Sequence, residues 1–293
     1  MLTDKQLRGQ YFTTTNPFKG EAFNLWNSLR PKNVPVIEPF AGAGNLFDYL
    51  PNEQWEGFDL EPQLDSIKQR DTLKDFPGHY QVAITNPPYL AKNSVKRRGG
   101  DVFFKYEDLY LDCLEVMLEH CDFVAAIIPS TFIGTGKFQH RLMAWDKLDY
   151  NLFSDTDCPA GVAYFIPERA NTKFYVNGKK ITPHTLTKGE TKVRFNVADG
   201  NYVLTAIDTT KAERISIAPV NDSFDRDKYL KNTSRNYVLF HADRELDCDA
   251  VNAAITEWRA QTNDFYLTSF KSLMKSGKYR KRLSFKDLSY FLP

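Results

Sequence analysis

The chain has 293 residues, of which 42% are hydrophobic, and it carries 38 basic and 37 acidic side chains. This length is enough for a substantial apolar core divided between two domains. Because no stretch reaches about 18 consecutive apolar residues and the first residues lack an apolar core, the sequence predicts neither a membrane span nor a signal peptide.

Cysteines and histidines are scattered along the chain. Cys113, Cys121, Cys158 and Cys248 show no CxxC spacing, and the histidines form no cluster. This pattern predicts reduced thiols in a cytoplasmic protein, and it predicts neither a disulfide framework nor a metal site.

Up to about residue 168, short apolar strands alternate with helices. Strands are predicted over residues 34–38, 55–60, 81–85, 123–128, 150–153 and 161–166. Helices are predicted over residues 17–29, 45–50, 106–120 and 137–145. Such alternation favours an α/β fold with a mostly parallel sheet covered by helices, in which a ligand binds at the carboxyl ends of the strands.

A glycine turn follows the first predicted strand, which ends at Glu38. Gly42 and Gly44 permit tight backbone angles there and let a ligand approach the backbone closely. Asp59, after the next strand, is suited to accept hydrogen bonds from ribose hydroxyls, and its distance from Gly44 approximates the ~20 residues expected in a βαβ unit. Asp71 is placed to contact an adenine edge. Either acid alone is more typical of a helix cap or a solvated strand end, whereas the ordered set indicates one binding site.

The sequence Asn86-Pro87-Pro88-Tyr89, here named the NPPY loop, follows the strand that ends at Thr85. Two prolines fix two φ angles, remove two backbone donors and push Asn86 out of the α region. The loop is therefore stiff, with hydrogen-bond acceptors aimed outward and an aromatic face beside them. This combination suits a planar base or amide whose amino group is to be modified, although the loop alone is equally consistent with a turn that closes a strand.

Residues 90–100 are polar, basic and end in two glycines, which predicts a mobile loop. An ordinary surface loop would also explain this composition. Because it follows the NPPY loop, Lys96, Arg97 and Arg98 are predicted to contact the backbone of a polyanionic ligand and to become ordered on binding.

Beyond residue 168 the pattern changes to that of a smaller α+β domain. Strands are predicted over residues 174–176, 192–197, 202–206, 214–217 and 237–240, and helices over residues 249–261 and 268–275. Residues 1–168 hold 16 basic and 23 acidic side chains, whereas residues 169–293 hold 22 and 14. A basic half joined to an acidic half suggests that one end of the protein binds a polyanion.

The densest basic cluster lies near the end of the sequence. A flexible tail or a solvated face would explain it, but its apolar neighbours favour an ordered basic surface that neutralises phosphates. The cluster comprises Lys271, Lys275, Lys278, Arg280, Lys281 and Arg282.

Taken in order, these motifs resemble the S-adenosylmethionine-dependent adenine-N6 DNA methyltransferases in which cofactor motifs precede the catalytic motif. The resemblance covers about residues 8–168 and includes residues 9–13, which are similar to the segment that packs over the methionine end of the cofactor. It implies a Rossmann-like catalytic domain over residues 1–168 and a target-recognition domain over residues 169–293.

The resemblance also implies the residues of the site. The catalytic loop would be Asn86, Pro87, Pro88 and Tyr89. The cofactor would contact Gln10, Tyr11, Phe12, Thr13, Glu38, Pro39, Phe40, Ala41, Gly42, Gly44, Asp59, Leu60, Asp71, Thr72 and Asn86. Double-stranded DNA would contact Lys96, Arg97, Arg98, Lys275, Lys278, Arg280, Lys281 and Arg282.

By this resemblance the chain would methylate a flipped-out adenine, either within a restriction-modification system or as an orphan or phage enzyme. A cognate restriction endonuclease would then belong to the same system without a stable complex. Many relatives carry a later aromatic residue that packs on the target base, whereas residues 154–159 have none here; Phe153 and Tyr164 are the candidate substitutes.

Two other classes of function stay open. The first comprises methyltransferases with similar loops that act on the glutamine amide of translation release factors or on RNA bases. The second is a non-catalytic DNA-binding module. Residues 9–13 and the basic second half favour DNA.

Overall fold

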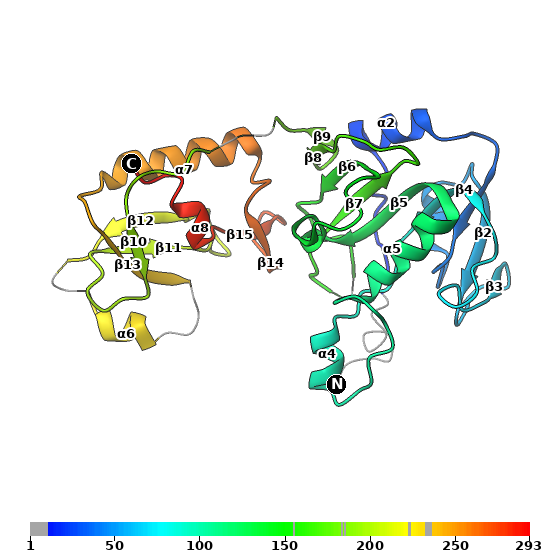
Figure 1. The fold of residues 1–293 in the computed structure, drawn as a ribbon, viewed down its shortest axis with the longest axis horizontal. Helices are drawn as coiled ribbons and strands as arrows, with labels where there is room; N and C mark the ends of the chain where they lie inside the picture. Colours follow the sequence, from blue (N-terminus) through cyan, green and yellow to red (C-terminus); the bar gives the residue numbers. More distant parts are fainter. Residues whose placement is uncertain (1–10, 155, 183, 185, 222–223, 232–235) are drawn as a thin grey trace. The chain divides into compact units, whose positions relative to one another are not determined.

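The computed structural model describes residues 11–154, 156–182, 184, 186–221, 224–231 and 236–293 (Figure 1). Two units form within the chain, Met1–Lys180 and Ile181–Pro293, named unit 1 and unit 2.

The described part of unit 1 contains a nine-stranded sheet in the order β3-β2-β1-β4-β5-β7-β6-β8-β9. Its strands are β1 (Pro35–Glu38), β2 (Gln54–Asp59), β3 (Ile67–Gln69), β4 (Tyr80–Thr85), β5 (Cys121–Pro129), β6 (Leu142–Lys147), β7 (Ala160–Phe165), β8 (Lys173–Val176) and β9 (Lys179–Lys180). Neighbours from β3 to β5 pair in parallel, as do β6 and β8, whereas β7 is antiparallel to both β5 and β6. The predicted α/β fold with a mostly parallel sheet is confirmed.

The middle of this sheet forms the core of unit 1. Every residue of β7 is buried, as are the last four residues of β4 and the last six of β5. Strands buried on both faces are nearly continuous apolar runs, and the sequences of these three strands have this composition. The helices of unit 1 are α2 (Gly20–Leu29), α3 (Asn45–Tyr49), α4 (Lys92–Arg97), α5 (Leu109–His120) and the 3-10 helix η1 (Ser130–Thr135).

The strand order reverses between β1 and β4. From β1 the chain runs outward through β2 to β3, and it then returns to place β4 on the other side of β1. In open α/β sheets a ligand binds at such a switch point, outside the carboxyl ends of the strands. The glycine turn follows β1 and the NPPY loop follows β4, so both lie at this point.

Three predicted elements of unit 1 are wrong. Residues 137–145 were expected as a helix, but β6 begins within this range. All six residues of β6 are buried between β7 and β8, so the strand has no solvent face. Residues 150–153 form no strand and make only an isolated bridge between Phe153 and Thr13. Residues 90–100, expected as a mobile loop, contain α4, whose C-cap nitrogen donates to carbonyls of the preceding turn.

The boundary between the units also differs from the predicted one after residue 168. β8 pairs with β6 and β9 pairs with β8, so both strands belong to the first sheet. With the division after Lys180, unit 1 holds 20 basic and 23 acidic side chains and unit 2 holds 18 and 14. The difference in charge between the two halves is therefore smaller than expected.

The described part of unit 2 has an α+β structure with two antiparallel sheets. Its four-stranded sheet has the order β10-β13-β11-β12, and a separate two-stranded sheet joins β14 to β15. The strands are β10 (Val193–Phe195), β11 (Tyr202–Thr205), β12 (Ser216–Pro219), β13 (Tyr237–Ala242), β14 (Thr268–Leu273) and β15 (Tyr279–Arg282); the helices are α6 (Arg226–Lys231), α7 (Cys248–Thr262) and α8 (Phe285–Leu288). Residues 268–275, predicted as a helix, are thus mostly strand, and the antiparallel partner β15 supplies their backbone hydrogen bonds.

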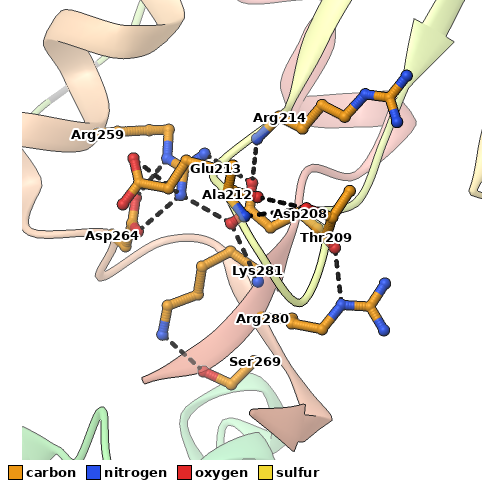
Figure 2. A network of polar contacts seen from close by, with 10 residues as sticks. All are labelled: Asp208, Thr209, Ala212, Glu213, Arg214, Arg259, Asp264, Ser269, Arg280 and Lys281. Carbon is orange, nitrogen blue, oxygen red and sulfur yellow. Dashed lines mark hydrogen bonds and ion pairs between the residues drawn. The ribbon is translucent and has the colours of Figure 1, made fainter. Parts of the chain in front are cut away.

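A buried ionic network joins α7 to the loop after β11 (Figure 2). The carboxylate of Asp208, which is fully buried, accepts hydrogen bonds from both terminal nitrogens of Arg259 at 3.0 and 2.8 Å. Arg259 also donates to Asp264 at 2.8 and 2.9 Å. The backbone nitrogen of Arg214 donates to Asp208 as well, at 2.9 Å. The network compensates the cost of burying these charges only while all members are present.

We expect Arg259→Met to lower the free energy of unfolding by about 3–5 kcal/mol, because it leaves the Asp208 carboxylate buried without its charged partner. Urea unfolding followed by circular dichroism measures the loss. Arg244→Met is the matched control, since Arg244 makes an exposed pair with Asp243 at 4.0 Å and such pairs contribute at most about 1 kcal/mol. Equal losses in the two variants would contradict the importance of the network.

Candidate active site

A cavity of about 560 Å³ lies at the carboxyl ends of the first strands of unit 1. This volume is in the range of small-molecule sites. The predicted residues that line it are Tyr11, Phe12, Thr13, Glu38, Pro39, Phe40, Ala41, Gly42, Asp59, Leu60, Asp71, Thr72, Asn86 and Pro88. Segments far apart in the sequence therefore meet at one pocket. Gln10, also predicted for the cofactor, lies outside the described residues.

The glycine turn has the conformation that its residues predict. Gly42 and Gly44 have φ angles of 52° and 75°, in the left-handed region that favours glycine. The backbone nitrogen of Gly42 donates to the Asp59 carboxylate at 2.7 Å, which ties the turn to the end of β2. Gly44 is not among the lining residues; a Cβ there would lie 2.8 Å from the side chain of Leu64, so this glycine shapes the turn before α3.

Asp59 has a structural task that the sequence did not predict. It is 6% exposed, and its second oxygen accepts a hydrogen bond from the backbone of Glu61 at 2.8 Å. A carboxylate offers about four lone-pair sites, so two backbone donors leave acceptor capacity toward the pocket. Asp71 lines the same pocket at a half-buried position and pairs with Lys74 at 2.8 Å.

Glu38 is a carboxyl group buried in the wall of the pocket. It accepts hydrogen bonds from the Thr85 hydroxyl at 2.6 Å and from the Phe40 backbone at 3.1 Å. Burial, with a smaller contribution from the charge of Asp59, outweighs these bonds and raises the pKa of Glu38 to about 8. At pH 7 the group is therefore mostly neutral, and a cation in the pocket would favour its ionised form.

The Asn86 side chain is held in one orientation. Its Nδ2 donates to the backbone oxygen of Tyr11 at 2.8 Å and lies 3.3 Å from the hydroxyl of Thr13. The Tyr89 hydroxyl lies 2.9 Å from Asn86 Oδ1 and 2.8 Å from the carbonyl oxygen of Ile127. A phenol has one proton, so Tyr89 donates to one of these two acceptors at a time. Sequence analysis did not predict that Thr13 and Tyr11 position this amide.

The aromatic face expected at Tyr89 is covered in this structure. The residue is 6% exposed, and its ring lies 5.7 Å from that of Tyr11, 6.0 Å from that of Phe153 and 6.2 Å from that of Tyr110. Of the two candidate substitutes for the later aromatic, Phe153 therefore borders the NPPY loop. Tyr164 instead packs in the core against Phe23 and Trp26 and is fully buried.

Residues 11–14, here named the amino-terminal segment, connect three parts of the site. The backbone oxygen of Thr13 accepts hydrogen bonds from Asn45 at 3.1 Å and from Tyr49 at 2.9 Å, both in α3. The backbone nitrogen of Thr14 donates to Leu152 at 2.9 Å. Together with the bonds from Asn86, these contacts hold the segment at the pocket.

Several lining residues were not predicted from the sequence. Six of them come from the stretch before α5 and from α5 itself, namely Phe103, Phe104, Leu109, Asp112, Glu115 and Val116. Phe103 and Leu60 both line the pocket, yet they are 73% and 57% exposed. The adjacent aromatic pair in an otherwise polar stretch was the signal that sequence analysis left unused.

None of the predicted DNA-binding residues is among the lining residues of the pocket. In unit 1, Lys96, Arg97 and Arg98 are exposed at the end of α4. In unit 2, Lys275 and Lys278 are exposed, and Arg280 and Arg282 are half-buried. The prediction for Lys281 is corrected, because its side chain is 2% exposed and its Nζ donates to Ser269 at 3.2 Å.

No group of three or more histidine, cysteine or acidic residues within the described ranges is arranged to hold a metal ion. Among the helices that the structure describes, none is both long and apolar enough to cross a membrane.

Comparisons with known proteins give no match to a family model and none to a curated protein. Among solved structures, the methyltransferase subunit of a type I restriction-modification system from Streptococcus thermophilus is 14% identical, with 61% of this chain and 50% of that chain covered and a TM-score of 0.44. A modification subunit of a putative type I restriction enzyme from Vibrio vulnificus is 13% identical, with 57% and 47% covered and a TM-score of 0.40. The 23S rRNA methyltransferase ErmE is 16% identical, with 50% and 67% covered and a TM-score of 0.33.

The chain thus spans about half the length of the first two structures. Because identities and TM-scores are this low, the function proposed below rests on the pocket and its motifs.

Proposed function

We propose that the chain is an S-adenosylmethionine-dependent methyltransferase that acts on the N6 amino group of adenine in DNA. The observation that carries this proposal is the meeting of the glycine turn, Asp59, Glu38 and Asn86 at one pocket. In the sequence, these are the motifs that resemble the adenine-N6 methyltransferases. Their meeting at one pocket supports this proposal.

The pocket residues fit the cofactor that the resemblance implies. Asp59 retains acceptor capacity for ribose hydroxyls, and Asp71 and Thr72, which line the same pocket, would contact the adenine. Glu38, buried in the same wall, would stabilise the cationic methionine end. When bound, S-adenosylmethionine supplies a methyl group activated by its sulfonium.

The NPPY loop provides the acceptors for the amino group. The adenine N6 nitrogen is a weak nucleophile because its lone pair is delocalised into the ring. With its two hydrogens accepted by Asn86 Oδ1 and the Pro87 carbonyl, the nitrogen moves toward tetrahedral geometry and its lone pair becomes available. Both dipoles then stabilise the positive charge that develops on N6 in the transition state. Tyr89 can turn its proton to Ile127, which leaves Asn86 Oδ1 to the substrate.

The target base has to enter the aromatic cluster beside the NPPY loop. Tyr11, Tyr89 and Phe153 cover one another in the structure, so the rings separate when a base stacks among them. Stacking on an aromatic ring contributes roughly 1–3 kcal/mol per base. Because N6 is engaged in pairing within a duplex, the base is flipped out of the helix before transfer.

Basic surfaces favour DNA over the other substrates that carry a planar amino group. The end of α4, shortly after the NPPY loop, exposes Lys96, Arg97 and Arg98. Unit 2 has a net positive charge. We propose double-stranded DNA as the partner, and we assign the enzyme to the cytoplasm, as part of a restriction-modification system or as an orphan or phage enzyme. A cognate endonuclease would then act on the same DNA without a stable complex.

The test is a transfer assay with tritiated S-adenosylmethionine and the full chain. We expect label in double-stranded DNA, and sequencing of modified bases should show N6-methyladenine at one recurring site. Label only in RNA, or only in a release-factor protein, would overturn the DNA assignment and leave the chemistry in place. A folded protein that binds no S-adenosylmethionine would overturn the proposal as a whole.

We expect Thr13→Val to lower kcat about threefold to tenfold with little change in KM for DNA, because the Asn86 amide loses one acceptor that orients it. Thr13→Ser keeps the hydroxyl and should restore kcat. The affinity for S-adenosylmethionine, measured by calorimetry, should stay near that of the wild type in both variants. If the valine and serine variants behave alike, the hydroxyl has no positioning role.

A further inference from the structure

The two-stranded sheet of unit 2, here named the β14–β15 ribbon, is separate from the four-stranded sheet of that unit. Its strands pair Thr268 with Arg282, Ser269 with Lys281 and Leu273 with Tyr279. An isolated two-stranded ribbon is marginally stable in water, so its order depends on contacts with the rest of unit 2.

Backbone hydrogen bonds fix the ribbon along its length to residues 206–210. The Asp208 nitrogen donates to the Lys281 oxygen at 3.0 Å, and the Leu283 nitrogen donates to the Ala206 oxygen at 3.0 Å. At the turn, the Lys275 nitrogen donates to the Thr210 oxygen at 2.8 Å. The ribbon is therefore held at both its base and its turn.

The buried ionic network reinforces this attachment (Figure 2). Asp208, which pairs with Arg259, also accepts a hydrogen bond from Arg280 Nε through its backbone oxygen at 2.7 Å. Tyr279 and Lys281 are 0% and 2% exposed and form the inner face of β15. The ribbon is thus preorganised, which reduces the entropy lost when a partner binds.

The other charged residues of the ribbon are all basic. Residues 265–286 contain seven basic residues and no acidic residue. Lys271, Lys275 and Lys278 are exposed on β14 and the turn, whereas Arg280 and Arg282 alternate with the buried residues of β15 and so share its outer face.

We propose that the β14–β15 ribbon enters the major groove of the target DNA, an inference that rests on the proposed DNA substrate. The major groove is about 12 Å wide and admits a two-stranded ribbon. Lys275 and Lys278 at the turn neutralise phosphates, and the outer-face guanidinium of Arg282 faces the base edges. Arginine is suited to this position because it binds guanine through two parallel hydrogen bonds.

A duplex fits this surface better than a single strand. Single-stranded nucleic acids bind on aromatic rings that stack on successive bases. Of the two aromatic residues of the ribbon, Tyr279 is fully buried and Phe270 is half-buried and packs against the core of unit 2, so neither stands on the surface as a free stacking ring. The exposed groups of the ribbon are mainly cationic, as expected for contacts with the backbone of a duplex.

The test compares two double variants of the full chain in DNA binding at several salt concentrations. We expect Lys275→Ala/Lys278→Ala to weaken binding to the duplex that the wild type methylates about tenfold or more. The slope of log K against log salt should fall by roughly 1.8. Lys188→Ala/Lys192→Ala is the matched control, because it removes the same charge from exposed lysines of unit 2 outside the ribbon. It should retain the wild-type affinity and slope.

All four lysines are exposed, so both variants should fold and bind S-adenosylmethionine like the wild type. Two results would overturn the ribbon proposal: the ribbon variant keeps the affinity and salt slope of an active wild type, or the two double variants lose the same affinity for DNA. In either case the methyltransferase assignment stands. If the wild type binds no DNA, both proposals fail. A third variant, Arg282→Ala, should broaden the set of methylated sites; an unchanged site would exclude base contact by Arg282.

Discussion

Asn86→Ala is expected to lower kcat for methyl transfer about 10²- to 10³-fold while the affinity for S-adenosylmethionine changes only a few-fold. The variant loses the acceptor that stabilises charge on N6, and removal of one such preorganised group typically costs this much. The variant keeps Glu38 and Asp59, the lining carboxyl groups proposed to hold the cofactor. Single-turnover kinetics and calorimetry on the same preparation measure both quantities.

Asn86 also holds the amino-terminal segment, so a control has to separate this contact from catalysis. Thr13→Val weakens the same contact and leaves Asn86 Oδ1 in place. Its expected loss is at most about tenfold, well below that of Asn86→Ala. A similar loss in the two variants would mean that Asn86 acts only by holding the segment, and the catalytic assignment would then be wrong.

The second large effect concerns pH and Glu38. Burial raises the pKa of Glu38 to about 8, and a bound cation favours the ionised carboxylate. Below pH 8, binding of S-adenosylmethionine therefore displaces a proton from Glu38. We expect the affinity to rise by up to about tenfold per pH unit from pH 6 to about pH 8 and then to level off. Calorimetry in two buffers of different ionisation enthalpy measures the released proton directly.

Glu38→Gln should weaken binding most at pH 8 and should remove most of this pH dependence. Asp71→Asn is the matched control, because it removes a half-buried carboxyl group from the same pocket and should leave the pH profile unchanged. An unaltered profile in Glu38→Gln would refute the role of this carboxyl group.

The same shift predicts a pH-dependent stability of the protein without ligand. An unfolded glutamate ionises near pH 4.3, whereas folded Glu38 keeps its proton until about pH 8. Over this interval the folded state binds more protons than the unfolded state, so Glu38 destabilises the fold increasingly as the pH rises from about 4.3 to about 8. Glu38→Gln should therefore be more stable than the wild type at pH 8, and equally stable near pH 4, in thermal unfolding.

The parts of the site that depend on local stereochemistry were predictable from the sequence. Gly42 and Gly44 permit the positive φ angles that the turn requires, and Pro87 and Pro88 prevent a helix directly after β4. Alternation of apolar strands and helices likewise predicted the parallel part of the sheet.

The parts that depend on tertiary contacts were not predictable. Residues 142–147 become a buried strand because β7 and β8 flank them, and residues 268–273 become a strand because β15 pairs with them. Lys281 looks like a surface cation in the sequence, but its place on β15 turns it toward the interior. The contact between Asn86 and the amino-terminal segment joins residues more than seventy positions apart, and no local pattern indicates it.

The amino-terminal segment couples the wall of the pocket to the orientation of Asn86. It lines the pocket and, through Tyr11 and Thr13, also holds the Asn86 amide. Any displacement of this segment would therefore also free Asn86 from its fixed orientation. In the proposed reaction, the acceptor geometry at Asn86 would then be complete only while the segment is in place, so ligand exchange through a displaced segment and methyl transfer would exclude each other in time.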